Sequence, residues 1–198
     1  MAKFSFEKDP FQNFLDLLAE AEALEIPEPN AMTLSTIGLN GRPSSRQVLF
    51  KGIIRGGLSF FTNYEGRKSL EIFNKPHVAL NFFWAALEMQ IRIEGQAEKT
   101  TREESETYFC TRPRESQIGA WASKQSEVLS DQQEFKTRYD EIEKKFKGQA
   151  IPCPPNWGGF LVRPETFEFW FGKKNRLHER YVYEKSSQLD WKRFMKFP

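Results

Sequence analysis

The sequence lacks the features of several common protein classes. Of its 198 residues only two are cysteines and two are histidines, and Cys110 and Cys153 stand in no CxxC or Cys/His spacing. This argues against a disulfide framework and a zinc site, so we expect no metal and a reducing, cytoplasmic location. The 29 basic residues nearly balance the 27 acidic ones, leaving a net charge of +2. We therefore expect no nucleic-acid partner.

Long apolar runs are also missing. None approaches the roughly 20 residues that a membrane span needs, and the first five residues, Met-Ala-Lys-Phe-Ser, lack the apolar core of a signal peptide. We expect a soluble protein with no membrane partner. The 19 phenylalanines and five tryptophans can supply both a core and flat surfaces for aromatic ligands.

The hydrophobic pattern predicts a single domain over residues 1–198, with residues 1–8 flexible. Asp9 and Pro10 cap and open a first helix, which ends before Pro27. Further helices are predicted at 66–73, at 101–110 with Thr101 and Glu104 as a capping box, and at 130–146 with Ser130 and Gln133 in the same roles. Strands are predicted at 32–37, 45–51, 58–62, 78–83, 89–97, 160–162, 166–170, 178–183 and 189–194. Many short strands with helices between them are typical of an α+β barrel.

The last third of the chain carries a candidate site. Glu168-Phe169-Trp170 is followed, after five residues, by Arg176-Leu177-His178-Glu179-Arg180. In an extended conformation Arg176, His178 and Arg180 would line one face. Two permanent cations and an imidazole beside an indole suit an anionic, planar ligand. The alternative is an exposed strand whose charges are merely solvated.

Three other segments could bind anions. Arg46 and Lys51 lie at an odd offset on a predicted strand, so they should face opposite ways and serve two separate anionic groups, unless both are simply rim cations. Residues 62–68 run from a strand into a helix start that carries Arg67 and Lys68, which is a natural phosphate cradle.

Tyr108, Arg112 and Ser116 are spaced by four and would stack along one helix face. Pro113 should bend that face. A phenol, a guanidinium and a hydroxyl at a bend could form a second phosphate site, and an incidentally polar helix end is the alternative. His77 is interpreted as structural or exposed, and four tryptophans (Trp84, Trp121, Trp157 and Trp191) are interpreted as core or interface residues.

Read together, these motifs resemble the pyridoxine (pyridoxamine) 5′-phosphate oxidase family over nearly the whole chain, from Asp9 to Trp191. The resemblance implies a split β-barrel homodimer that binds FMN at the subunit interface. It assigns FMN contacts to Arg46, Gln47, Val48, Leu49, Phe50, Lys51, Phe61, Thr62, Arg67, Lys68, Gln90, Gln125, Ser126, Trp170 and Arg180. It assigns the substrate phosphate to Lys51, Tyr108, Arg112 and Ser116, and substrate-ring and catalytic contacts to Arg176 and His178.

The implied activity is oxidation of pyridoxine or pyridoxamine 5′-phosphate to pyridoxal 5′-phosphate, with dioxygen as acceptor and hydrogen peroxide as product. Two residues depart from the family pattern: Phe171 replaces a usual polar residue, and Lys196 replaces a C-terminal arginine. No substrate role is assigned to residues 1–8. A flavin reductase on the same scaffold and a non-catalytic flavin or pyridoxal phosphate carrier remain alternatives.

Overall fold

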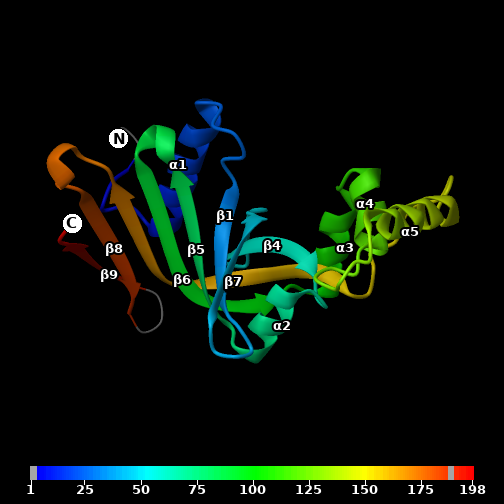
Figure 1. The fold of residues 1–198 in the computed structure, drawn as a ribbon. Coiled ribbons are helices and arrows are strands. Elements are labelled where there is room, and N and C mark those ends of the chain that lie inside the picture. Colours follow the sequence, from blue (N-terminus) through cyan, green and yellow to red (C-terminus); the bar gives the residue numbers. More distant parts are fainter. Residues whose placement is uncertain (1–3, 187–189) are drawn as a thin grey trace.

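The computed structural model describes residues 4–186 and 190–198, and a nine-stranded antiparallel sheet forms the centre of this part (Figure 1). Its strands are β1 (Ala31–Ile37), β2 (Pro43–Leu49), β3 (Ile53–Ile54), β4 (Gly57–Asn63), β5 (His77–Trp84), β6 (Met89–Lys99), β7 (Trp157–Phe171), β8 (Glu179–Lys185) and β9 (Trp191–Lys196). The helices are α1 (Pro10–Ala23), α2 (Arg67–Asn74), α3 (Arg102–Cys110), α4 (Arg114–Ala122) and α5 (Gln132–Lys145), with short 3₁₀ turns η1 (Ala85–Leu87) and η2 (Lys174–Arg176).

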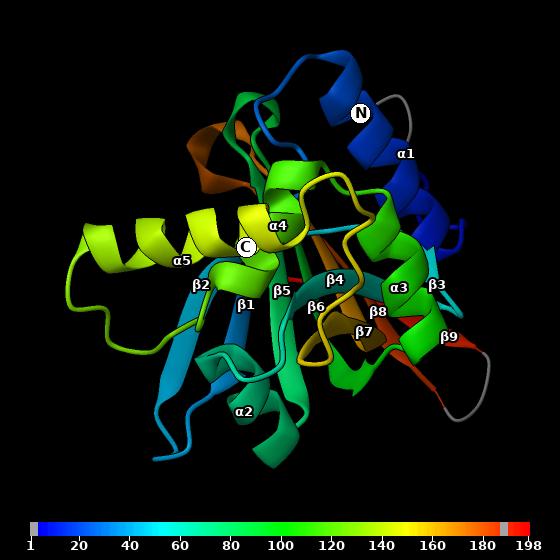
Figure 2. The same ribbon diagram turned by 90° about the vertical axis from the view of Figure 1, so that its right-hand side faces the viewer.

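The sheet runs in the order β2-β1-β5-β6-β7-β4-β3, and β8 and β9 extend it from β7. It does not close on itself along this path, and the α+β class predicted from the sequence is confirmed. Helices α3, α4 and α5 gather at one end of the molecule, in front of the sheet in Figure 2. Among the described residues, no helix has the length and apolar character to cross a membrane.

Two apolar clusters hold these layers together. The larger one fills the space between α1 and the sheet, where Phe14, Leu17 and Ala21 of α1 are fully buried. The Asp9 carboxylate accepts a hydrogen bond from the Phe11 amide at 2.9 Å, so the predicted helix cap is confirmed. The smaller cluster lies beneath α3, α4 and α5 and includes Trp157.

The two predicted strands at 160–162 and 166–170 are in fact one strand, β7. Pro164 does not interrupt it, because the pairing with β6 shifts register between Glu94 and Gly95 and absorbs the irregularity. Gly95 is required there, since an added Cβ would clash with the Arg163 carbonyl oxygen.

The start of α5 also differs from the prediction. Asp131, not Ser130, is the cap, and its carboxylate accepts from the Glu134 amide at 2.8 Å. Ser130 instead donates its hydroxyl to the Glu134 carboxylate at 2.7 Å. The cap is therefore displaced by one residue, because an aspartate follows the serine and its carboxylate accepts from the first turn of the helix.

The two ends of the chain meet on β8. Phe4 packs on Phe171 and Tyr181, with ring centroids 5.0 and 4.9 Å apart, and Phe6 packs on Tyr183 at 5.3 Å. Phe4 and Phe6 thus make ring contacts within the segment 1–8, whose flexibility stays a prediction, and residues 1–3 lie outside the described part. The predicted strand 189–194 corresponds to β9, and its residue 189 is likewise outside the described residues.

Candidate functional site

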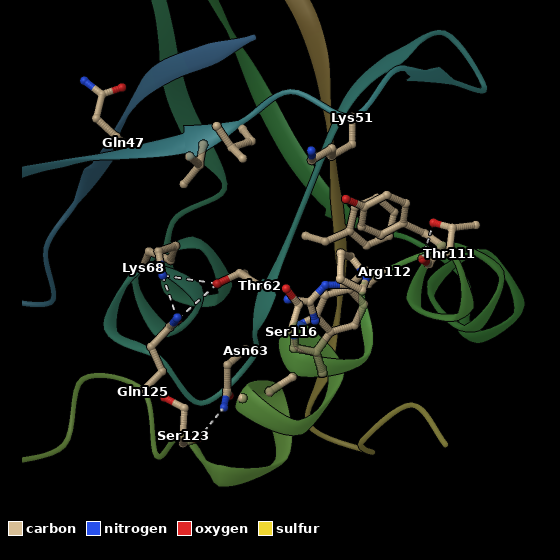
Figure 3. A pocket seen from close by; sticks show the side chains of 18 residues that line it. Gln47, Lys51, Thr62, Asn63, Lys68, Thr111, Arg112, Ser116, Ser123 and Gln125 are labelled. Carbon is tan, nitrogen blue, oxygen red and sulfur yellow. Dashed lines mark hydrogen bonds between the residues drawn. The ribbon is translucent and has the colours of Figure 1, made fainter. Parts of the chain in front are cut away.

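A cavity of about 770 Å³, called here the first cavity, opens where β2, β4, α3 and α4 meet (Figure 3). It is lined by Gln47, Val48, Leu49, Lys51, Phe61, Thr62, Asn63, Lys68, Tyr108, Thr111, Arg112, Pro113, Ser116, Gly119, Ala120, Ser123, Gln125 and Trp157. These described lining residues include three cations and no carboxylate. The cavity is therefore suited to an anionic ligand.

One cationic end of the first cavity is built around Lys68, in the first turn of α2. Its ammonium donates to the Thr62 hydroxyl at 3.1 Å and to the Gln125 side-chain oxygen at 2.7 Å (Figure 3). Burial and the nearby Arg46 charge lower the pKa of Lys68, while Glu71 opposes the shift. An anion beside the ammonium would favour its charged form and so oppose the lowering of the pKa.

Behind Lys68, the buried carboxylate of Glu71 joins two arginines. It accepts from Arg46 at 2.8 Å, from Arg67 at 2.8 Å and from the Thr36 hydroxyl at 2.5 Å. Burial alone would raise the pKa of Glu71, but the hydrogen bonds from Thr36, Arg67 and Arg46 together hold this pKa below its ordinary value. Arg46 therefore lies behind the cavity wall and does not line the cavity.

The other cationic end contains Lys51, Arg112 and Ser116, across the cavity from Lys68 (Figure 3). The Arg112 guanidinium lies 4.7 Å from the centre of the Trp157 ring. Its Nη1 atom is buried and has no hydrogen-bond partner among the described residues, and burial lowers the pKa of the group. A buried donor without a partner is costly, and Arg112 lines the cavity, so its guanidinium is suited to an anionic ligand.

The bend predicted at Pro113 is confirmed, because α3 ends at Cys110 and α4 begins at Arg114. Three near-parallel rings form the wall beside the bend: Phe61 stacks on Tyr108 at 4.0 Å and on Trp157 at 5.6 Å. Trp157 is buried in the smaller cluster, as a core residue, but its further place in the cavity wall was not predicted from the sequence. The following glycines could have indicated it, since an added Cβ at Gly159 would lie 2.8 Å from the Phe61 ring.

A second cavity of about 670 Å³ lies on the sheet and shares Gln47 with the first. Its described lining also includes Asn81, Gln90 and Trp170, and Gln90 donates its side-chain amide to the Asn81 side-chain oxygen at 2.7 Å. The His178 ring packs against Trp170 with centroids 4.6 Å apart. An amide pair and an indole form a surface suited to a flat, polar ring.

The predicted stripe of Arg176, His178 and Arg180 is wrong. Arg176 has a left-handed backbone (φ +60°) within η2, and β8 begins only at Glu179. Arg180 is held by the Glu168 carboxylate, which accepts from it at 2.8 and 3.0 Å. The turn 172–178 also lies at the opposite end of the sheet from α3 and α4 (Figure 1).

The predicted site residues thus fall into separate places. The first cavity brings together Gln47, Val48, Leu49, Lys51, Phe61, Thr62, Lys68, Tyr108, Arg112, Ser116 and Gln125, whereas Gln90 and Trp170 line the second. Arg67 and Ser126 border a neighbouring hollow, where the Arg67 amide donates to the Ser126 hydroxyl at 3.1 Å. Phe50 belongs to the core. Of the two departures from the family pattern, Phe171 is also buried in the core. The other, Lys196, places its ammonium nitrogen 3.6 Å from a carboxylate oxygen of Glu168.

Comparison with known proteins places this chain in a family. Residues 17–146 match the family described as pyridoxamine 5′-phosphate oxidase. The chain belongs to the pyridoxamine 5′-phosphate oxidase family. Residues 157–198 match the C-terminal dimerisation region of pyridoxine 5′-phosphate oxidase, which supports a homodimer. Membership of the family also supports FMN as the cofactor.

Individual relatives agree with this assignment. The chain is 49% identical to a pyridoxine/pyridoxamine 5′-phosphate oxidase of Rubrobacter xylanophilus, covering 98% of this chain and 88% of the relative. It is 48% identical to one of Bdellovibrio bacteriovorus, covering 98% and 100%. Among solved structures, PhzG from Burkholderia lata, in complex with tetrahydrophenazine-1-carboxylic acid, has a TM-score of 0.90 at 30% identity and covers 96% of this chain and 93% of PhzG.

Proposed function

We propose that this protein catalyses the FMN-dependent oxidation of pyridoxine 5′-phosphate and pyridoxamine 5′-phosphate to pyridoxal 5′-phosphate. The alcohol loses two hydrogens to dioxygen and gives hydrogen peroxide. The amine reaction also consumes one water and releases ammonia. The observation that carries the proposal is the presence of two cationic ends in one cavity whose described lining residues include no carboxylate, since cofactor and substrate would each bring a phosphate.

The Lys68 end fits the FMN phosphate. Lys68 has a lowered pKa that a phosphate would relieve, Gln125 and Thr62 already contact its ammonium, and the N-terminus of α2 follows Gly66, which provides no side-chain cap. The positive end of the α2 helix dipole, at this start of the helix, favours an anion. FMN, when bound, supplies the redox chemistry, and the protein supplies position and charge.

The Arg112 end fits the substrate phosphate. Its buried Nη1 lacks a partner among the described residues, and Lys51 and Ser116 line the same side of the cavity. The guanidinium carbon lies over the Trp157 ring, and a guanidinium can bind a phosphate through two parallel hydrogen bonds. An enzyme that bound only FMN would have no use for this second end.

We further propose that a complete site forms between two subunits. The first cavity and the turn 172–178 are at opposite ends of the sheet (Figure 1), so Arg176 and His178 of one chain are far from its own Arg112. A dimer of two-fold symmetry can bring the turn of each subunit to the cavity of its partner. In this arrangement Arg176 and His178 would orient the substrate ring, and Arg180 would contact FMN.

The test is oxygen uptake measured in parallel with pyridoxal phosphate formation, using FMN-loaded protein. Matched oxygen loss and aldehyde gain with either phosphorylated substrate is the expected result, and unphosphorylated pyridoxine is the control for the Arg112 end. Bound FMN with neither signal would refute the proposal. Nicotinamide-dependent flavin reduction would then indicate a flavin reductase, and tight pyridoxal phosphate binding without oxygen uptake would indicate a carrier.

A second candidate follows from the similarity to PhzG. That protein binds a reduced tricyclic carboxylic acid, and the Arg112 end could accept a carboxylate in place of a phosphate. The candidate activity is therefore flavin-dependent oxidation of a carboxylated polycyclic compound. Comparing kcat/KM for tetrahydrophenazine-1-carboxylic acid and for pyridoxine 5′-phosphate decides between the two substrates.

A further inference from the structure

The turn 172–178, which connects β7 to β8, is held by backbone hydrogen bonds. The Gly172 amide donates to the Glu88 carbonyl at 2.7 Å, and the Leu177 amide donates to the Lys174 carbonyl at 3.2 Å. Between these anchors Asn175 and Arg176 both have a left-handed backbone, with φ of +57° and +60°. The turn therefore reverses sharply and brings its last residue back over its first ones.

This reversal places the His178 imidazole on the backbone of Lys173. The Lys173 amide donates to His178 Nδ1 at 3.1 Å. The imidazole also packs against the Trp170 ring, with the two ring centroids 4.6 Å apart. The imidazole is half-buried between the two. Its position is thus set by one hydrogen bond and one ring contact.

A backbone amide can only donate, so Nδ1 must offer a lone pair. An imidazolium cannot do this, because both of its nitrogens carry protons, and a neutral imidazole can do it only with its proton on Nε2. We propose that the turn 172–178 fixes His178 as the neutral Nε2–H tautomer, which makes it a hydrogen-bond donor to the ligand beside Trp170. This inference rests on the proposed function for the identity of the ligand.

The tautomer restricts what His178 can do. With Nδ1 engaged by Lys173 and Nε2 already protonated, the imidazole has no free lone pair and cannot serve as a general base for the substrate alcohol or amine. It instead requires an acceptor on the substrate, such as an oxygen on an aromatic ring. The Lys173 amide is therefore a positioning group, and His178 selects for substrates that present an acceptor there.

Nitrogen-15 NMR of the holoenzyme tests the tautomer directly. The chain has only two histidines, and His77→Gln, at an exposed site on β5, assigns the remaining imidazole signal to His178. We expect, at neutral pH, an unprotonated Nδ1 and a protonated Nε2 in His178. A proton on Nδ1, or two tautomers in exchange, would overturn the inference whether or not the protein oxidises B6 phosphates.

A matched pair of variants gives a second readout. In His178→Gln the side-chain amide nitrogen reaches the position of Nε2 and can still donate, whereas in His178→Asn it reaches only the position of Nδ1. Loss of one hydrogen bond to the substrate corresponds to a factor of up to about ten, so His178→Asn should lose up to about tenfold more kcat/KM than His178→Gln, with FMN retained in both. Equal losses, or the reverse order, would contradict a donor at Nε2.

Discussion

Replacing Glu71 by alanine should destabilise the protein far more than removing its exposed partner Arg67. Glu71 lies in α2, and its carboxylate accepts from Arg46, Arg67 and Thr36. Its side chain is 2% exposed and that of Arg46 is 19% exposed. The alanine substitution would leave Arg46 partly buried without its counter-charge.

The two arginines should respond differently. Breaking a buried ion pair from one side costs about 3–5 kcal/mol, so Glu71→Ala should lower the free energy of unfolding by that amount. The Arg67 side chain is 64% exposed, and an exposed pair contributes at most about 1 kcal/mol. Arg67→Ala should therefore be nearly neutral for stability, although it removes one of the same carboxylate's bonds.

The pH dependence has a definite sign. The pKa of Glu71 in the folded state lies below its ordinary value of 4.5, so the carboxylate binds protons less readily in the folded chain than in the unfolded one. Its contribution to stability is fully present above pH 4.5 and is lost as the pH falls through the folded-state pKa. The stability difference between the wild type and Glu71→Gln should consequently narrow in acid.

Urea unfolding of the FMN-free protein measures these differences without the contribution of bound cofactor. With a slope of about 2–3 kcal/mol per M, Glu71→Ala should lower the midpoint by about 1–2 M. Glu106→Ala is the control, because Glu106 makes a comparable 2.7 Å pair with Arg102 but is 53% exposed. A midpoint for Glu71→Ala as close to the wild type as that of Glu106→Ala would refute the reasoning.

Two further predictions concern the cofactor and turnover. Lys68→Ala should lose FMN on dialysis, because the Lys68 ammonium is the cation proposed to bind the phosphate. The control variant Lys136→Ala, on the exposed face of α5, should retain FMN. Full flavin retention by Lys68→Ala would contradict the proposed phosphate site. Arg176→Ala should keep FMN but lower turnover by about 10²-fold, the scale of one preorganised charge contact; unchanged kcat would remove Arg176 from the catalytic residues.

Local signals explain which parts of the fold could be predicted. Asp9 and Thr101 were identified as caps because the cap and its partner are three residues apart or fewer, and both caps are present in the structure. The bend at Pro113 follows from the same kind of local sterics. Asp131 shows how precisely a cap can be predicted from local sequence. Two adjacent residues can each cap the same turn, and only the geometry of the folded chain selects one.

The errors share a different cause. The stripe from Arg176 to Arg180 was predicted from alternation, but Asn175 and Arg176 have a left-handed backbone. They lie in a turn that begins at Gly172, whose amide donates to Glu88, a residue far earlier in the chain. The role of Trp157 in the cavity wall depends in the same way on Phe61 and Tyr108, which reach it through separate elements. The sequence indicated which residues have side chains suited to the site. Their positions in the fold could not be predicted, because they depend on pairings between distant segments.

The separation of the site residues leads to a last prediction, on the dimer. Lys51 lines the first cavity, and Arg176 lies in the turn 172–178 at the other end of the sheet. Suppose that each active site combines the cavity of one subunit with the turn of its partner. In the Lys51→Ala homodimer the cavity half of both sites is then impaired, and in the Arg176→Ala homodimer the turn half of both sites is impaired. A mixed dimer would then contain one site with both substitutions and one site with neither.

Co-expression of the two variants with different affinity tags allows the mixed dimer to be isolated. By the two-fold symmetry of such a dimer, it should recover about half of the wild-type turnover per dimer, while each homodimer stays impaired. If each site were instead formed within a single chain, both sites of the mixed dimer would carry one substitution and no activity would return. A mixed dimer as inactive as its parents would therefore refute the shared site while leaving the family assignment intact, because that assignment rests on sequence and fold alone.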